Sequence, residues 1–225
     1  MRCQSSTHRT DNGSPLDCAT SPTASSPLPR QSRPFPRKAP PVSHILTVSG
    51  SPMEVSRSAK LLQYVSMDLA DLGHTIEHIT VRDLPAESLL HADFGDKALL
   101  EAAAKVERAD GLVIATPVYK AAFSGILKSW LDLLPQFALK SKTVLPLATG
   151  GSVAHALALD YALRPVLMSM GARQVVQGYL VIEHMIETVG ESGVTRIDDD
   201  ALSMLNRVVE AFCESLPLPR SLATA

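Results

Sequence analysis

The stretch "LVIAT", Leu112–Thr116, decides the fold class together with "TVLPLAT", Thr143–Thr149. Both runs are apolar almost throughout instead of alternating with polar residues, and this is typical of strands that are covered on both faces. Such strands occur in parallel sheets that carry helices on each side. The sequence therefore predicts an α/β protein whose sheet is buried on both faces.

The same order of strand and helix extends outward from these two runs. Apolar, β-branched runs predict strands, and the stretches between them have helical character. We expect strands at Ile45–Ser49, Thr75–Val81, Leu112–Thr116, Thr143–Thr149 and Gln174–Ile182, and helices at Arg57–Leu72, Lys97–Ala109, Ser124–Leu133, Val153–Met170 and Asp199–Leu216. Five β-α units predict a doubly wound, five-stranded parallel sheet in a three-layer α/β/α sandwich. A ligand cleft is expected outside the carboxyl ends of the strands.

The first part of the chain has a different composition from the rest. Residues 1–43 are rich in Ser, Pro, Thr and Arg and have almost no apolar periodicity, so they cannot bury enough surface to fold. We expect a disordered extension, with a start codon assigned too far upstream as its origin; a targeting signal is the alternative. Residues 44–217 then form one domain, and residues 218–225 form a tail.

Composition excludes several classes of function. The chain of 225 residues has 21 basic and 23 acidic side chains, a balance that does not favour nucleic acid as a partner. It lacks the run of about 18 apolar residues that a membrane-spanning helix needs. Its three cysteines, Cys3, Cys18 and Cys213, are widely spaced, which predicts a reducing, cytoplasmic compartment. No Cys/His spacing indicates a metal site, so we expect small molecules or other proteins as partners.

The loop after the first predicted strand reads "GSPMEVSRS", Gly50–Ser58. Hydroxyls, one guanidinium and the amides of a helix start favour a phosphate dianion, although a serine N-cap beside a surface arginine is the simpler alternative. Ser51 and Arg57 have the spacing of the phosphate loop of low-molecular-weight tyrosine phosphatases. That chemistry needs a thiolate where Ser51 stands, so we expect the loop to bind a phosphate and not to react with it.

The loop after the third predicted strand reads "ATPVYKAAFSG". Pro117 is expected to close the strand, with Tyr119 at the cleft as part of an apolar wall for a ring. Taken alone, a Thr-Pro turn with a partly buried tyrosine explains the same residues. Lys120 and Lys128 are either cofactor contacts or solvated charges, and we favour the second role for Lys128.

The loop after the fourth predicted strand reads "LATGGSVAH". Gly150 and Gly151 follow Thr149 and allow a ligand to approach the backbone closely, although paired glycines also simply start helices. His155 is expected one turn into the next helix, in a capping, packing or catalytic role. Three such loops at one edge predict a site for a mononucleotide. Since they hold no cluster of acid, base and nucleophile, the bound molecule is expected to bring its own chemistry.

Three motifs carry a resemblance to a known family: "GSPMEVSRS", "ADGLVIATPVYKAAFSGILKSWLDLLP" and "LPLATGGSVAHALALDYALRPVL". From about His44 to Val181 the chain resembles NADPH-dependent FMN reductases, and most closely the reductase of alkanesulfonate monooxygenase systems. The resemblance implies a flavodoxin-like fold and FMN bound at the edge described above. It implies that Ser51, Ser56, Arg57 and Ser58 hold the phosphate, that Pro117, Val118, Tyr119 and Lys120 flank the flavin, and that Thr149, Gly150 and Gly151 meet the polar edge of its ring.

Two further residues matter for this resemblance. The family often has an arginine where Met53 stands, which leaves Arg57 as the main cation for the phosphate. The sulfonate branch has an inserted tyrosine in a π-helical bulge at a tetramer interface, and "ALALDYALRP" places Tyr161 there. In the family this bulge goes with flavin that leaves as a substrate, and no other residue is expected to be catalytic.

The resemblance implies an NAD(P)H-dependent FMN reductase that transfers hydride from NADPH to FMN. Reduced FMN would then pass to a two-component, alkanesulfonate-type monooxygenase for sulfur acquisition, and the reductase would be a homotetramer or homodimer. No short motif of the chain shows the preference for NADPH over NADH. Two alternatives remain open: a quinone or azo reductase with tightly bound FMN, and a flavodoxin-type electron carrier.

Overall fold

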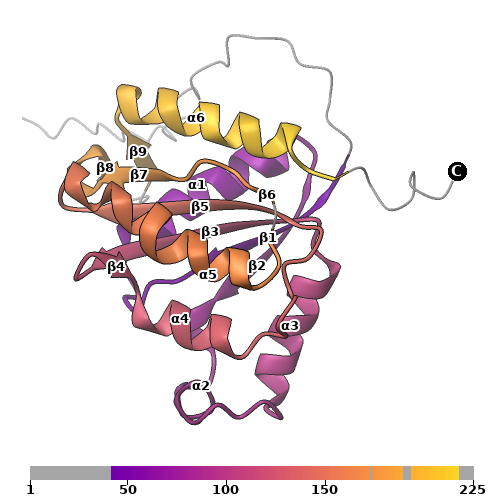
Figure 1. Ribbon diagram of the computed structural model, residues 1–225. Coiled ribbons are helices and arrows are strands. Elements are labelled where there is room, and N and C mark those ends of the chain that lie inside the picture. The colour runs from indigo at the N-terminus through magenta and orange to yellow at the C-terminus, as the bar shows by residue number, and fades with distance from the viewer. Residues whose placement is uncertain (1–41, 173, 190–193, 218–225) are drawn as a thin grey trace, which may run out of the picture. The chain divides into compact units, whose positions relative to one another are not determined.

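The computed structural model describes residues 42–172, 174–189 and 194–217 (Figure 1). The predicted extension, apart from Val42 and Ser43, and the predicted tail lie outside these residues. The strands are β1 (His44–Ser49), β2 (Thr75–Thr80), β3 (Gly111–Tyr119), β4 (Ala122–Phe123), β5 (Thr143–Gly150), β6 (Gln174–Val175), β7 (Tyr179–Ile182), β8 (Ile186–Val189) and β9 (Val194–Ile197). The α-helices are α1 (Arg57–Asp71), α2 (Ala86–His91), α3 (Lys97–Arg108), α4 (Gly125–Asp132), α5 (Arg164–Ser169) and α6 (Asp199–Glu214). Shorter turns are η1 (Val81–Asp83), η2 (Val153–Ala156), the π-helical η3 (Leu159–Leu163) and η4 (Glu183–Met185).

The sheet has the strand order β2-β1-β3-β5-β6, and β7 also pairs with β5. All of these pairings are parallel. This is the flavodoxin-like order, in which the winding direction reverses between β1 and β3. The predicted doubly wound parallel sheet is therefore confirmed, and its ligand edge is expected next to the ends of these two strands.

Alternate side chains of the strands enter two separate cores. Leu112 and Ile114 of β3 pack with helices α3, α4 and α5, whereas Val113 and Ala115 pack with α1 and α6. Figure 1 shows α1 and α6 on one side of the sheet and α3, α4 and α5 on the opposite side. The runs that are apolar throughout are thus explained, because both faces of β3 are buried.

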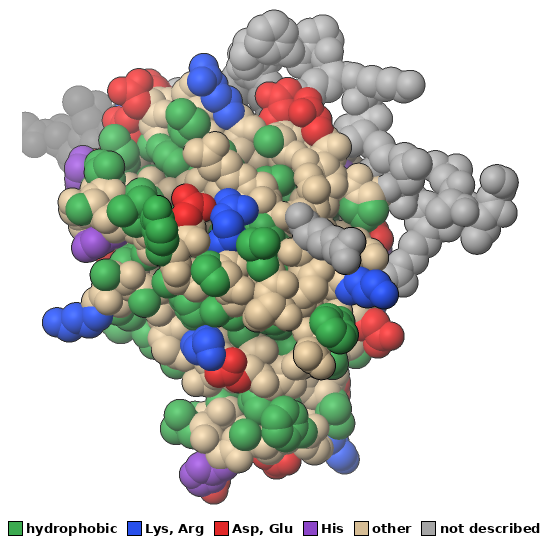
Figure 2. Space-filling view, viewed as in Figure 1, with side chains coloured by type: hydrophobic (Ala, Val, Ile, Leu, Met, Phe, Trp, Pro, Cys, Tyr) green, Lys and Arg blue, Asp and Glu red, His purple; other side chains and the backbone are tan. Residues whose placement is uncertain are grey.

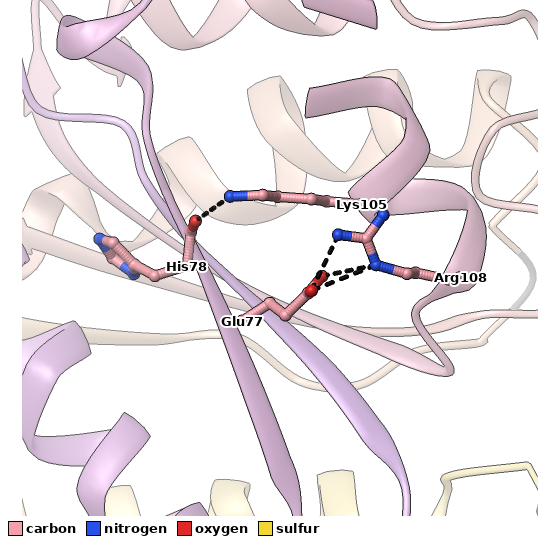
Figure 3. Close-up of polar contacts among 4 residues, drawn as sticks. All are labelled: Glu77, His78, Lys105 and Arg108. Atoms are coloured by element: carbon pink, nitrogen blue, oxygen red, sulfur yellow. Dashed lines mark hydrogen bonds and ion pairs between the residues drawn. The ribbon is translucent and has the colours of Figure 1, made fainter. Parts of the chain in front are cut away.

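Polar contacts fix α3 against the middle of β2. The Arg108 guanidinium binds both carboxylate oxygens of Glu77, with Nη2 to Oε1 at 2.8 Å and Nε to Oε2 at 3.0 Å (Figure 3). The Lys105 ammonium donates to the carbonyl oxygen of His78 at 3.1 Å. The Arg108 contact holds the pKa of Glu77 below its ordinary value.

The fifth strand is interrupted, where the sequence predicted one strand from Gln174 to Ile182. Val144 pairs with Val175, and Leu147 pairs with Tyr179, so β5 advances three residues while its neighbour advances four. Pro146 lies in β5 between these two pairs and has no N–H to donate to the ladder. The sheet keeps five positions, and the edge position is filled by β6 and β7 in turn.

Two other regions differ from the prediction. The helix expected over Val153–Met170 consists of η2, a short helical link, the π turn η3 and α5. No strand was predicted between Ile182 and Asp199, where the structure has the antiparallel pair β8 and β9. Among the described residues no helix is long and apolar enough to cross a bilayer.

Candidate active site

The predicted loops meet at one edge because the strands before them end side by side. Ser49 of β1 pairs with Ala115, and Pro117 of β3 pairs with Thr149 of β5. The amide of Gly50 continues the ladder by donating to the carbonyl oxygen of Ala115 at 2.8 Å. The three loops inferred from the sequence therefore lie at a single edge of the sheet.

The first loop is held in shape by its own serines. Ser51 accepts a hydrogen bond from the Met53 amide at 3.1 Å, and its side chain is buried. Ser56 is the N-cap of α1, and its hydroxyl lies 2.8 Å from that of Ser58, which is also buried. A phosphate contact by these three hydroxyls stays a prediction, while their present bonds order the loop.

Arg57 is exposed and is the first residue of α1. Amides in the first turn of a helix have no carbonyl acceptor within it, and the helix dipole is positive at this end. An exposed guanidinium beside such amides fits a phosphate dianion. Its present partner is the carboxylate of Glu183, with Nη1 3.6 Å from Oε2. The donor set of the loop therefore suits a phosphate dianion.

Ser124, which sequence reasoning did not select, connects the first two loops. Its hydroxyl donates to the carbonyl oxygen of Gly50, and its amide donates to Thr116 Oγ1 at 3.0 Å. The same hydroxyl accepts from the Leu127 amide at 3.3 Å as the N-cap of α4. The Phe-Ser-Gly sequence at a predicted helix start signalled only a cap, so the tie to Gly50 depends on tertiary contact.

The loop after β3 is a tight hairpin. Pro117 was predicted to close the strand, but β3 continues to Tyr119 and pairs there with Ala122 of β4. Pro117 is tolerated because pairing with β1 ends two residues earlier, at Ala115. The two turn residues, Lys120 and Ala121, both have positive φ, at 50° and 62°.

A two-residue turn with positive φ at both positions normally uses glycine or asparagine. Lys120 and Ala121 hold this conformation with side chains that disfavour it, and such strain clusters at ligand sites. Tyr119 precedes the turn and is 47% exposed, while Pro117 is buried and Val118 is half-buried. The hairpin therefore presents Tyr119 and Lys120 at the edge, where a wall for the flavin was predicted.

The loop after β5 presents backbone and not side chains. Thr149 and Gly150 are buried at the end of β5, and Gly151 is exposed. A Cβ on Gly150 would lie 2.9 Å from His155 Nδ1, whereas one on Gly151 would meet no described atom within 4 Å. His155 packs against Gly150, and its buried Nδ1 atom has no hydrogen-bond partner among the described residues. The contact with Gly150 therefore supports a packing role for His155.

Tyr161 lies in the middle of the π turn η3, as predicted, and its side chain is 79% exposed. Arg164 follows the turn and donates to Asp160 Oδ1 at 3.0 Å and to the carbonyl oxygens of Val175 and Val176 at 2.8 and 3.1 Å. These two carbonyls belong to the interrupted edge strand. The π turn is therefore fixed to the break between β6 and β7.

Two hollows away from this edge are weaker candidates for a functional site. Two hollows of about 640 and 660 Å³ lie near the amino end of β5 and share Phe137, Lys140 and Lys142. The Lys142 ammonium is already bound to the carbonyl oxygens of Glu107 and Ala109, at 2.8 and 2.7 Å. Within the described part of the chain, no group of three or more His, Cys, Asp or Glu side chains is placed to hold a metal ion.

Several known proteins that are similar to this chain are FMN reductases. A family model for NADPH-dependent FMN reductases matches residues 43–187. An FMN reductase (NADPH) of Escherichia coli K12 is 49% identical over 134 residues, which are 60% of this chain and 70% of the relative. One from Pseudomonas putida is 51% identical over 134 residues, 60% of this chain and 68% of the relative.

A solved structure agrees with these relatives. The apo form of an NADH:FMN oxidoreductase superposes with a TM-score of 0.72 at 45% identity, over 80% of this chain and 93% of that one. The family model covers more than half of the chain and includes all three loops of the edge. The chain therefore belongs to the NADPH-dependent FMN reductase family and is an NAD(P)H:FMN oxidoreductase that uses FMN and NADPH.

Proposed function

We propose that the three loops at the carboxyl edge form the FMN site. The observation that carries this proposal is the exposed Arg57 guanidinium at the start of α1, beside a loop ordered by its own serines. The proposed contacts are the phosphate with Ser51, Ser56, Arg57 and Ser58, the flavin ring with Pro117, Val118, Tyr119 and Lys120, and its polar edge with Thr149, Gly150 and Gly151. These three groups of residues lie at or directly after the carboxyl ends of β1, β3 and β5.

The protein side of the reaction is binding and orientation. The chemistry supplied by bound FMN is the acceptance of a hydride from NADPH. Tyr119 and Val118 would hold the ring at the edge, and Arg57 would fix the other end of the molecule. Since these loops carry no acid, base and nucleophile cluster, catalysis rests on how closely the two cofactors are brought together.

Steady-state kinetics with two flavins test this site. Arg57→Ala should raise the KM for FMN at least tenfold and leave the KM for riboflavin, which has no phosphate, nearly unchanged. Arg207→Ala removes an exposed arginine from α6 and is the matched control, expected to change neither value. An Arg57→Ala enzyme with an unaltered KM for FMN would remove Arg57 from the site.

The reductase would release its reduced flavin to a partner. Support comes from the resemblance to reductases of alkanesulfonate systems and from an Arg57 that is about half exposed. The partner would be a two-component, alkanesulfonate-type monooxygenase, and the role would be sulfur acquisition. Sulfite release from an alkanesulfonate should require this protein, NADPH, FMN, oxygen and the monooxygenase together. Equal sulfite release without the reductase would contradict this role.

A second copy of the chain is the proposed cover for the face around the π turn. Figure 2 shows hydrophobic side chains over α5 and the segment before it. The exposed ones in this segment are Val153, Leu157, Tyr161 and Met168. A homotetramer or homodimer through this face should dissociate when Tyr161 is replaced by Asp. Light scattering should show the smaller species, while Leu90→Asp on α2 should leave the assembly intact.

A further inference from the structure

Glu183 reaches the candidate phosphate site from a fourth segment of the edge. It follows directly after Ile182 of β7, which pairs with Gly150 at the end of β5. Its carboxylate Oε2 lies 3.6 Å from Nη1 of Arg57. The side chains of Glu183 and Arg57 are 45% and 53% exposed, so both remain accessible to a ligand from solvent.

The loop after β1 has few basic side chains that could bind a phosphate. Arg57 is the only lysine or arginine between Gly50 and Ser58, and Arg82, which approaches this loop, lies 4.0 Å from the Glu54 carboxylate through its Nη1 atom. A guanidinium binds carboxylates and phosphates through the same planar set of donors. The Glu183 carboxylate therefore pairs with the same guanidinium, that of Arg57, that the flavin phosphate would bind.

We propose that Glu183 competes with the FMN phosphate for Arg57 and so weakens the binding of FMN. This inference rests on the proposed phosphate site. A phosphate dianion that reaches Arg57 has to displace the carboxylate, and it then lies close to a negative charge that stays tethered to β7. When the flavin leaves, the carboxylate returns to Arg57. Glu183 thus favours a flavin that exchanges over one that is retained.

Substitution of Glu183 by Gln tests the competition, because Gln keeps the shape and removes the charge. Dissociation constants are measured by flavin fluorescence quenching at low ionic strength, for FMN and for riboflavin. Glu183→Gln should bind FMN about two- to fivefold more tightly, the range expected for a half-exposed ion pair. Riboflavin affinity should not change, since riboflavin brings no phosphate to Arg57.

A matched control uses another glutamate that pairs with an arginine. Glu77 binds Arg108 and lies opposite Leu46, away from the carboxyl edge. Glu77→Gln makes the same change of charge and should leave FMN affinity unchanged. The gain from Glu183→Gln should also become clearly smaller when Arg57 is replaced by Ala, because the competition requires the guanidinium.

The outcomes separate this inference from the phosphate site itself. If Arg57→Ala weakens FMN binding but Glu183→Gln does not tighten it, the competition is refuted and the site stands. An equal gain for riboflavin, or an undiminished gain in the Arg57→Ala background, also refutes it. If Arg57→Ala leaves FMN binding unchanged, the phosphate site fails and the inference fails with it.

Discussion

The hydroxyl of Ser124 donates a hydrogen bond to the carbonyl oxygen of Gly50, and this bond joins the loop after β3 to the loop after β1. Both residues are buried, and the same hydroxyl also accepts from the first turn of α4. One side chain thus caps a helix and aligns two of the three loops that form the candidate flavin site. The arrangement of these two loops therefore involves a residue that was not among the predicted FMN contacts.

Replacement of Ser124 by Ala should lower the free energy of unfolding by about 2–4 kcal/mol, because it removes a helix cap and leaves the buried Gly50 carbonyl without this donor. FMN affinity should fall several-fold as the two loops separate. Urea unfolding and FMN titration measure the two effects. Ser152→Ala removes an exposed cap from η2 and should cost less than about 1 kcal/mol. Equal losses for both variants would contradict the account.

Arg164 should be needed for the stability of the π turn and the broken edge strand. Arg164→Ala loses the bonds to Asp160, Val175 and Val176, and we expect the free energy of unfolding to fall by about 1–3 kcal/mol. Arg164→Lys should recover only part of this loss, since an ammonium lacks the planar set of donors that spans these acceptors. Unfolding in urea compares the three proteins, and a Lys variant as stable as the wild type would argue against the geometry.

The break in the edge strand should require glycine at position 178. A Cβ there would lie 2.8 Å from the carbonyl oxygen of Pro146 and 3.0 Å from Leu159 Cδ1, and backbone cannot easily retreat. Gly178→Ala should therefore destabilise the protein by about 1–3 kcal/mol. Gly125→Ala is the control, because its Cβ would meet no described atom within 4 Å. That variant should be neutral or slightly more stable in thermal unfolding.

Stability should fall between pH 7.5 and pH 5.5. Burial lowers the pKa of His74 and of His78 below the ordinary value near 6.5. The unfolded chain then binds more protons than the folded one, so the stability present above about pH 6.5 is lost as the pH falls through that value. The lowered pKa of Glu77 acts only below its ordinary value of 4.5, outside this window.

His74→Gln tests this assignment, since Gln does not titrate and keeps an acceptor for the Ser43 amide, which now donates to His74 Nδ1 at 3.3 Å. Urea unfolding at pH 7.5, 6.5 and 5.5 should show a smaller loss for the variant than for the wild type. Identical losses would mean that His74 does not contribute to the pH dependence.

The fold class followed from local sequence, since two runs without alternation already require a sheet covered on both faces. The edge of the sheet that carries the site was predictable as well, because the carboxyl ends of parallel strands lie together and each loop comes directly after its strand in the chain. The break opposite Pro146 was not predicted. It depends on the register between β5 and its neighbour, and on carbonyls bound by Arg164, a residue on another element.

The candidate site was predictable only in part, for a similar reason. Arg57 could be selected because it lies in the same short loop as its neighbouring serines. Ser124 and Glu183 are separated from that loop by long stretches of sequence, and only the folded chain brings them to Gly50 and Arg57. The Lys120–Ala121 turn was missed because neither residue is typical of positive φ.

The measurement that tests the central claim most directly is an anaerobic reaction of the flavin-free protein with NADPH and a large excess of FMN. Loss of the flavin absorbance reports how many equivalents of FMN one protein molecule reduces. A reductase that binds FMN at this edge and releases it should bleach many equivalents. Bleaching that stops at about one equivalent would indicate a tightly held flavin, as in a quinone or azo reductase, and no bleaching at all would contradict the assignment as an NADPH-dependent FMN reductase.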